Sequence, residues 1–240
     1  MRRFVQSFSS GDGFPAGFPP ALLQALEVAP ERYNIAVRKP ASVIVLEEGG
    51  PAIKELQWGL IPRWCKTPDT PYTTVTARLE RAAGSRLFKQ AWERRHCVVP
   101  LNGYYKWDRN AKPAAPYFVQ AGDGRILMMA GIWECWEKGD TPLCTFSILT
   151  HPNPAIPAPL VADGPVFLVL DRWKRWLDAD LWFPKRFLLD SPQPALESYR
   201  VSRAMRDPNR DDYTLLEPAD PLEPLDPLQP GEEDFDEDGD

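Results

Sequence analysis

The stretch "SRLFKQAWERRHCVVPLNGYYKW" (residues 85–107) decides the fold, because it joins a helix directly to buried strand. Its first eleven residues predict an amphipathic helix that begins at Ser85, a residue type that caps helix N-termini. Four apolar side chains share one face of that helix: Leu87, Phe88, Ala91 and Trp92. From Cys97 to Trp107 the chain is rich in β-branched and aromatic residues, which favours a strand.

Outward from this stretch, strand patterns outnumber helix patterns and mostly follow one another directly. The predicted strands are "ASVIVLEE" (41–48), "IKELQWGLIP" (53–62), "PYFVQA" (116–121), "ILMMAGIWECW" (126–136), "TFSILT" (145–150) and "VFLVL" (166–170). Two further helices are expected at "PPALLQALEVA" (19–29) and "DRWKRWLD" (171–178). Gly122–Gly124 indicates a hairpin turn between two strands. This order predicts an α+β protein around a curved, mainly antiparallel sheet.

The composition excludes several classes of protein. The four cysteines have no C-x-x-C spacing (Cys65, Cys97, Cys135 and Cys144), and Cys97 and Cys135 lie in apolar runs, where a free thiol behaves as a small hydrophobe. With only His96 and His151 to join them, we predict no metal site and no cofactor. No apolar run is long enough to cross a bilayer, and the N-terminus lacks a signal sequence, so we expect a cytoplasmic protein that contacts no membrane.

The charge is divided unevenly along the chain. Residues 217–240 hold eleven of the 34 acidic side chains and no basic one, so the first 216 residues carry 28 basic against 23 acidic side chains. A mildly basic body with a separate acidic segment suits a polyanionic partner, although a charge of about +5 is also within ordinary scatter. We therefore predict one domain over residues 1–216 and an acidic tail over residues 217–240.

Proline recurs at every third position of the acidic tail, from Pro218 to Pro230. This period matches the three residues per turn of polyproline II, in which Asp220, Glu223 and Asp226 would share one edge. Two interpretations stay open: a disordered, solubilising tail, or an extended acidic strip that docks on the basic body or on a partner.

Lys106 stands between Tyr105 and Trp107 in a run that otherwise reads as buried strand. A solvated strand lysine, a cation held over aromatic rings and a substitute at a catalytic position all fit this local pattern.

Several blocks, taken together and in order, resemble one known family. They are "RFVQSF", "RYNIA", "WGLIPRW", "ARLE", the opening stretch, "PYFV", "MAGIWECW", "FSILT" and "RVSRAM". The chain resembles the SOS response-associated peptidase (SRAP) family of abasic-site-processing proteins over nearly all of its first 218 residues. The resemblance implies a single compact domain with a β-barrel-like core, flanking helices and a basic cleft for single-stranded DNA. It also implies a role in the response to DNA damage.

The family's chemistry, as the resemblance implies it, starts from a cysteine that follows the initiator Met. Its amine and thiol close a thiazolidine ring on the aldehyde of an abasic site. An asparagine in "NAR" orients the sugar, and a glutamate in "GYYEW" and a histidine in "IHDRMP" move protons.

This chain departs from the family at all four of those positions. Arg2 stands for the cysteine, Thr76 for the asparagine, Lys106 for the glutamate and Val161 for the histidine. Lys106 also reverses the charge of the acid that it replaces. Four losses together predict a pseudoenzyme with no intact catalytic residue.

DNA binding could survive these losses. Guanidinium groups make bidentate phosphate contacts and a tryptophan face stacks a base, and five residues match positions of the family's DNA-binding surface: Arg3, Arg63, Trp64, Arg78 and Lys106. For Trp64 the alternative is core packing, and for Arg78 it is an ion pair with a carboxylate such as Glu80.

Three functional hypotheses follow. The first is a catalytically degenerate monomer that binds single-stranded or abasic-site DNA. The second is an active crosslinking or lyase enzyme that uses the Met1 amine or Lys106 as nucleophile. The third is an interaction module of a mobile element with no DNA role.

Overall fold

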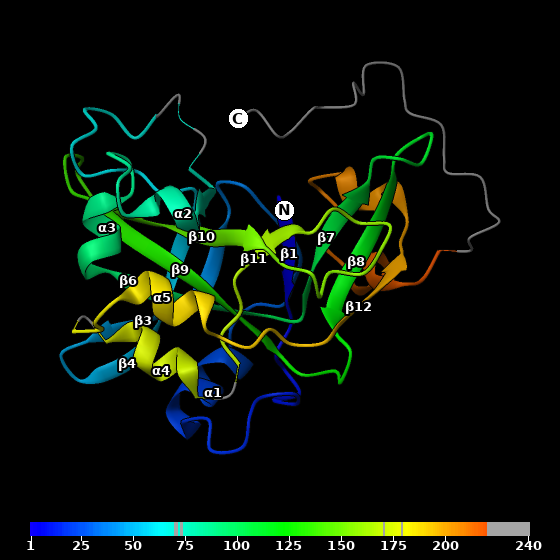
Figure 1. Cartoon of the computed structure of the whole chain (residues 1–240), viewed down its shortest axis with the longest axis horizontal. Coiled ribbons are helices and arrows are strands. Elements are labelled where there is room, and N and C mark those ends of the chain that lie inside the picture. The colour runs from blue at the N-terminus through cyan, green and yellow to red at the C-terminus, as the bar shows by residue number, and fades with distance from the viewer. Residues whose placement is uncertain (70–71, 73, 170, 179, 220–240) are drawn as a thin grey trace.

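The strands of the protein form two sheets in the computed structural model of the chain (Figure 1). The structure describes residues 1–69, 72, 74–169, 171–178 and 180–219. The five-stranded sheet has the order β12 (Leu196–Arg200), β8 (Ala115–Ala121), β7 (Gly103–Asp108), β1 (Arg3–Gln6) and β2 (Arg32–Ala36). The seven-stranded sheet follows β11 (Asp163–Pro165), β10 (Leu143–Pro152), β4 (Gly50–Trp58), β3 (Pro40–Glu47), β6 (His96–Leu101) and β9 (Leu127–Trp136), and β5 (Thr76–Arg78) pairs with β10.

Five strands of the larger sheet close into a barrel. Because β10 pairs with both β4 and β9, the path from β10 through β4, β3, β6 and β9 returns to its start. The pairing of β10 with β4 is parallel, and the other four pairings of this ring are antiparallel. The predicted α+β class and the mainly antiparallel, barrel-like sheet are confirmed.

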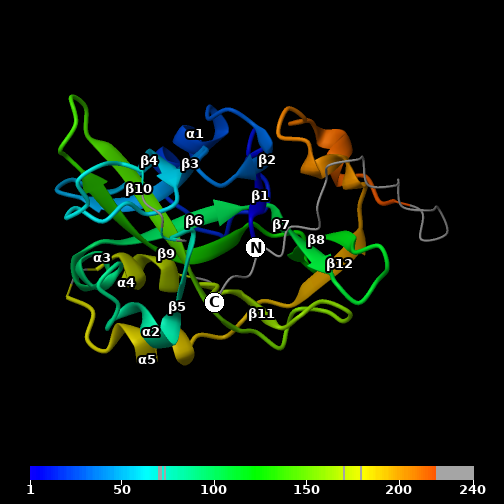
Figure 2. The same ribbon diagram turned by 90° about the horizontal axis from the view of Figure 1, so that it is seen from above.

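The helices are short and gather on one side. They are α1 (Pro20–Glu27), α2 (Leu79–Ala82), α3 (Lys89–Arg94), α4 (Arg172–Leu177) and α5 (Pro184–Leu189), with 3₁₀ turns at Arg203–Arg206 and Tyr213–Leu216. Helices α2 to α5 lie on the side of the molecule away from β7, β8 and β12 (Figures 1 and 2). None of the described helices is long and apolar enough to cross a bilayer.

The helix predicted from Ser85 begins later than the pattern indicates. The carbonyl of Ser85 accepts hydrogen bonds from the backbone N–H groups of both Phe88 and Lys89, which makes a turn before α3. The apolar face is placed as predicted, because Ala91 and Trp92 are buried under this helix.

The core has two main parts, one on each face of the barrel strands. Ile44 of β3 packs with the residues under the helices, while its neighbours Val43 and Val45 pack toward the five-stranded sheet. On that second side Phe4 of β1 meets Trp58 of β4 edge to face, with ring centroids 5.0 Å apart. The period of two in burial therefore separates a helix-covered face from a sheet-covered face.

The opening stretch divides between the two sheets, so the single strand expected from Cys97 to Trp107 is wrong. The break falls at Asn102, whose side chain accepts from the N–H of Ser7 at 2.7 Å and donates to its carbonyl at 2.9 Å. At the next residue, a Cβ on Gly103 would lie 2.5 Å from the carbonyl oxygen of Val119. Only glycine allows β8 to approach this closely.

The hairpin predicted at Gly122–Gly124 is also wrong. The turn itself exists, since the N–H of Gly124 donates to the carbonyl of Ala121. However, β8 before it belongs to the five-stranded sheet and β9 after it belongs to the barrel. The turn changes sheets instead of returning the chain along its neighbour.

The predicted boundary at residue 216 stays a prediction. Pro218 forms an isolated β-bridge with Val201, and the N–H of Ala219 donates to the carbonyl of Arg200 at 2.9 Å. The polyproline II pattern predicted for the rest of the acidic tail concerns residues 220–240, which lie outside the described residues.

Candidate functional site

Lys106 lies in β7, which pairs with β1. These strands are antiparallel, with Phe4 opposite Tyr104. If this register is extended by two residues, past the end of the pairing, Arg2 comes level with Lys106. The ammonium group of Lys106 donates a hydrogen bond to the carbonyl of Asp163, with an N···O distance of 2.6 Å. Lys106 therefore ties the five-stranded sheet to β11 of the other sheet.

Thr76 lies in β5, and Val161 lies in the loop before β11, the strand that holds Asp163. Thr76 is opposite Ile148 in the parallel pair of β5 with β10, and β11 pairs with the same strand, with Asp163 opposite Pro152. Val161 precedes Asp163 by two residues, and 59% of its surface is exposed. The structure thus places Lys106 in contact with Asp163, Val161 two residues before that contact in the chain, and Thr76 beside the strand that pairs with β11.

Thr76 and Lys106 point to the same side of their sheets. Ile148, which pairs with Thr76, and Tyr104, two residues before Lys106, both belong to the core between the barrel and the five-stranded sheet. Paired residues and residues two apart in a strand share a face. Both candidate positions are therefore at the edge of that shared core.

A row of cations crosses the five-stranded sheet at Lys106. On one side, the extended register of β1 would add Arg2. On the other, Lys106 is opposite Tyr117 of β8, and Tyr117 is opposite Arg200 of β12. Since strands are spaced about 4.8 Å apart, the Cα atoms of Lys106 and Arg200 are about 10 Å apart. We call Arg2, Lys106 and Arg200 the cation row.

Sequence analysis missed Arg200. The signal was present in "RVSRAM", which begins at this residue, but only strand pairing shows that Arg200 shares a face with Lys106.

Arg3 faces the other way. Its guanidinium donates to the side-chain oxygen of Asn34 and to the carbonyl of Arg206, both at 2.9 Å. These bonds fasten β1 to β2 and to the first 3₁₀ turn. A role for Arg3 in binding DNA is still a prediction, and these contacts already account for the residue structurally.

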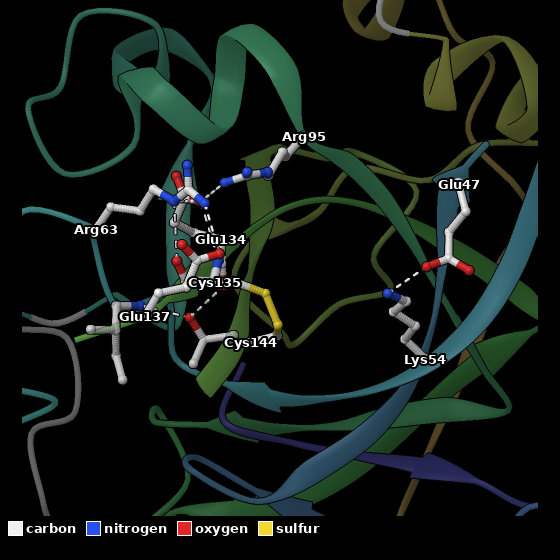
Figure 3. The surroundings of a disulfide bond; sticks show 10 residues. Glu47, Lys54, Arg63, Arg95, Glu134, Cys135, Glu137 and Cys144 are labelled. Carbon is white, nitrogen blue, oxygen red and sulfur yellow. Dashed lines mark hydrogen bonds and ion pairs between the residues drawn. A yellow bond between two sulfur atoms is a disulfide. The ribbon is translucent and has the colours of Figure 1, made fainter. Parts of the chain in front are cut away.

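Arg63 belongs to an ion-pair cluster at the far end of β9 (Figure 3). Its Nε lies 3.2 Å from a carboxylate oxygen of Glu134, whose side chain is 2% exposed, and its Nη2 lies 3.0 Å from Glu137. Arg95 also pairs with Glu134, and burial lowers the pKa of the Arg95 guanidinium. Two acids thus balance two cations here.

Trp64 is partly open to solvent. Its exposed fraction is 37%, and the guanidinium of Arg86 lies 4.5 Å above the ring centroid, a cation–π contact. The core-packing alternative does not describe this side chain. The distance from Trp64 to Arg78 follows from β10. Arg63, next to Trp64, contacts Cys135, which is opposite Cys144 of β10, whereas Arg78 is opposite Thr150 of the same strand. Six residues of strand separate Cys144 from Thr150, so the surroundings of Trp64 and of Arg78 lie about 20 Å apart.

Arg78 is exposed, and Glu80 pairs with His151 instead of with Arg78. Among the described residues Arg78 has no side-chain partner. Burial alone would raise the pKa of Glu80, but its own backbone N–H and His151 donate hydrogen bonds that outweigh it, and the pKa is lowered. The predicted Arg78–Glu80 pair is therefore not formed, and Glu80 is hydrogen-bonded to His151 instead.

The cysteines supply no nucleophile to this site. Cys135 and Cys144 are opposite each other in β9 and β10 and form a disulfide, so the free thiol expected at Cys135 is wrong. Their alignment comes from strand register, which no spacing in the sequence reveals. Cys65 and Cys97 are free but buried, and burial raises the pKa of both thiols.

The chain is similar to known proteins in both sequence and fold. A family model described as SOS response associated peptidase (SRAP) matches residues 11–208. The abasic site processing protein YMR114C of Saccharomyces cerevisiae is 35% identical over 133 residues, which cover 54% of this chain and 36% of that protein. The abasic site processing protein YoaM of Bacillus subtilis is 26% identical over 190 residues, covering 77% of this chain and 84% of that protein. A crystal structure of a Bacteroides thetaiotaomicron protein has the same fold, with a TM-score of 0.71 at 20% identity over 91% of this chain and 97% of that chain.

Proposed function

The chain belongs to the SRAP family, and from this premise we propose that it binds single-stranded DNA, including abasic-site DNA, without the family's crosslinking chemistry. The binding surface would be the cation row with Arg78 on the neighbouring strand. Trp64 would extend it for a longer strand. The relatives named as abasic site processing proteins motivate the substrate class.

The observation that carries the proposal is the register of β1 with β7, which, when extended by two residues, brings Arg2 level with Lys106. The resemblance assigns the family's nucleophile and its acid to these two positions, and the extended register would set them side by side. Here both are cations, so the geometry of the site is kept while its charge is reversed. Phosphate contacts gain from that reversal, whereas ring closure needs a thiol that Arg2 cannot supply.

The loss of chemistry has further support in the remaining groups. Neither free thiol is accessible, and the Tyr104 hydroxyl, two residues from Lys106, is fully buried, which raises its pKa. The ammonium of Lys106 donates a hydrogen bond to the carbonyl of Asp163, and this bond links the two sheets. No described group near Arg2 combines an accessible thiol with a base.

A denaturing gel tests the chemistry. The full chain is incubated with an oligonucleotide that bears one abasic site, with and without borohydride, beside an undamaged oligonucleotide. We expect no shifted band in any lane. A band without reductant would overturn the proposal, and a band only with borohydride would indicate an imine at the Met1 amine or at Lys106, which Lys106→Ala would distinguish.

Salt dependence tests the binding. Each phosphate contact to a single strand contributes about −0.7 to the slope of log K against log salt, so the four cations of the proposed surface predict a slope near −3. Lys106→Gln and Arg200→Gln should each reduce that slope by about 0.7. Lys89→Gln in α3, on the helix side, is the matched control and should leave the slope unchanged. A full chain without measurable affinity at low salt would favour the third hypothesis, an interaction module with no DNA role.

A further inference from the structure

The chain leaves the described body at the end of the cation row. Val201 is bridged to Pro218, and the N–H of Ala219 donates to the carbonyl of Arg200. In the antiparallel register that this bridge sets, Ala219 is the neighbour of Arg200. The order across the sheet is therefore Lys106, Tyr117, Arg200 and Ala219, and the extended register of β1 would add Arg2 beside Lys106.

The residue after Ala219 is the first of a strongly acidic run. Residues 220–240 contain ten acidic side chains and no basic one. Three strand spacings separate Ala219 from Lys106, about 15 Å, and 21 residues at about 3.1 Å each would measure about 65 Å. The segment is thus long enough to cross the whole row, and its attachment keeps its local concentration high.

The spacing of the first acids fits the row. Asp220, Glu223 and Asp226 recur every three residues, which in a polyproline II chain places successive carboxylates about 9 Å apart along one edge. The Cα atoms of Arg200 and Lys106 are about 10 Å apart. Opposite charges at matching intervals, tethered at one end, favour contact.

We propose that residues 220–240 bind across Arg2, Lys106 and Arg200 of their own chain and compete there with DNA. The competition rests on the proposed function, whereas the intramolecular contact does not. The carboxylates of residues 220–240 would occupy the positions that the phosphates of single-stranded DNA take when DNA is bound. The acidic segment and the DNA are both negatively charged, so they would compete for the same cations. DNA would have to displace the tail, and rising salt would loosen both.

The contact is tested in the full chain without DNA. A carbodiimide joins an amine to a carboxylate that touches it, so Lys106 should crosslink to residues 220–226, detected by mass spectrometry after proteolysis. Arg200→Gln and 0.5 M salt should each reduce that crosslink several-fold. If Lys106 forms no crosslink with the tail while more exposed lysines such as Lys89 do, the proposal is wrong.

The competition is tested by two variants with equal changes of charge. In the first, Asp220, Glu223 and Asp226 become Asn, Gln and Asn; in the second, Glu232, Glu233 and Asp234 become Gln, Gln and Asn. We expect the first to bind an undamaged single strand about tenfold more tightly than the natural chain at low salt, and the second to gain clearly less. If the two variants gain equally in affinity for DNA, the proposal that Asp220, Glu223 and Asp226 contact the cation row is wrong. A crosslink in a chain that binds no DNA would refute the proposed function and support the intramolecular contact.

Discussion

Glu134 is the centre of the ion-pair cluster, and replacing it by glutamine should destabilise the protein. The carboxylate is 2% exposed and pairs with both Arg63 and Arg95. It also accepts from the N–H of Cys135 at 3.1 Å. Glu134→Gln keeps the shape of the side chain and removes its charge, so two guanidinium groups lose the partner that offsets their partial burial.

The size of the effect follows from the exposure of the three side chains. Removing one partner of a buried pair costs about 3–5 kcal/mol. Because Arg63 and Arg95 are 34% and 26% exposed, water compensates them in part, and we expect a loss of about 2–3 kcal/mol in the free energy of unfolding. For a domain of this length each kcal/mol lowers the melting temperature by about 2–4 °C, so the shift should be about 4–12 °C.

The measurement is urea unfolding followed by tryptophan fluorescence, with thermal melting as a second probe. Glu137→Gln is the matched control, because Glu137 also pairs with Arg63 but is 59% exposed, and exposed pairs contribute less than about 1 kcal/mol. A loss below about 0.5 kcal/mol for Glu134→Gln would refute the argument, and so would equal losses for the two variants.

Three further predictions concern single positions. Gly103→Ala should lower the free energy of unfolding by about 2–3 kcal/mol in urea titrations, because its Cβ would lie 2.5 Å from the Val119 carbonyl; an unchanged midpoint would contradict the close approach. Burial lowers the pKa of His96, so the unfolded chain binds the proton more readily, and stability should fall as pH drops below about 6.5; His96→Gln should flatten that slope in melts at different pH. Cys144→Ser should cost about 2–3 kcal/mol in oxidising buffer and little after reduction, since the disulfide to Cys135 closes a loop with a sequence separation of 9; equal losses in both buffers would argue against the bond.

Local patterns predicted the elements well where the chain's own neighbours decide the structure. The Pro20 start of α1, the helix at Arg172–Leu177 and the hairpin of β3 and β4 around Gly50 all depend on nearby residues. Errors fall at Gly103 and at Gly122–Gly124, where the chain passes from one sheet to the other. The strand predicted at residues 166–170 is also wrong, because its described residues form only an isolated bridge between Phe167 and Met129. A glycine marks a turn in the sequence, but which sheet accepts the next strand depends on partners far along the chain.

The candidate site shows the same division. Sequence alone predicted that residues 2, 76, 106 and 161 occupy the altered family positions, and it determined the acidic composition of residues 217–240. It could not show that Arg63 and Arg3 already bond to protein groups, that Glu80 pairs with His151, or that Arg200 joins Lys106.

The physical reason is that the type of each residue can be read from the sequence, whereas the face of a sheet on which its side chain lies depends on how the strands are paired. The lysine at position 106 is visible in the sequence, because a residue type can be read without the fold. That Lys106, Arg200 and Ala219 lie in one row depends on hydrogen bonds among strands far apart in the chain. Only the tertiary structure sets that register, because each pairing depends on partners that the local sequence does not specify.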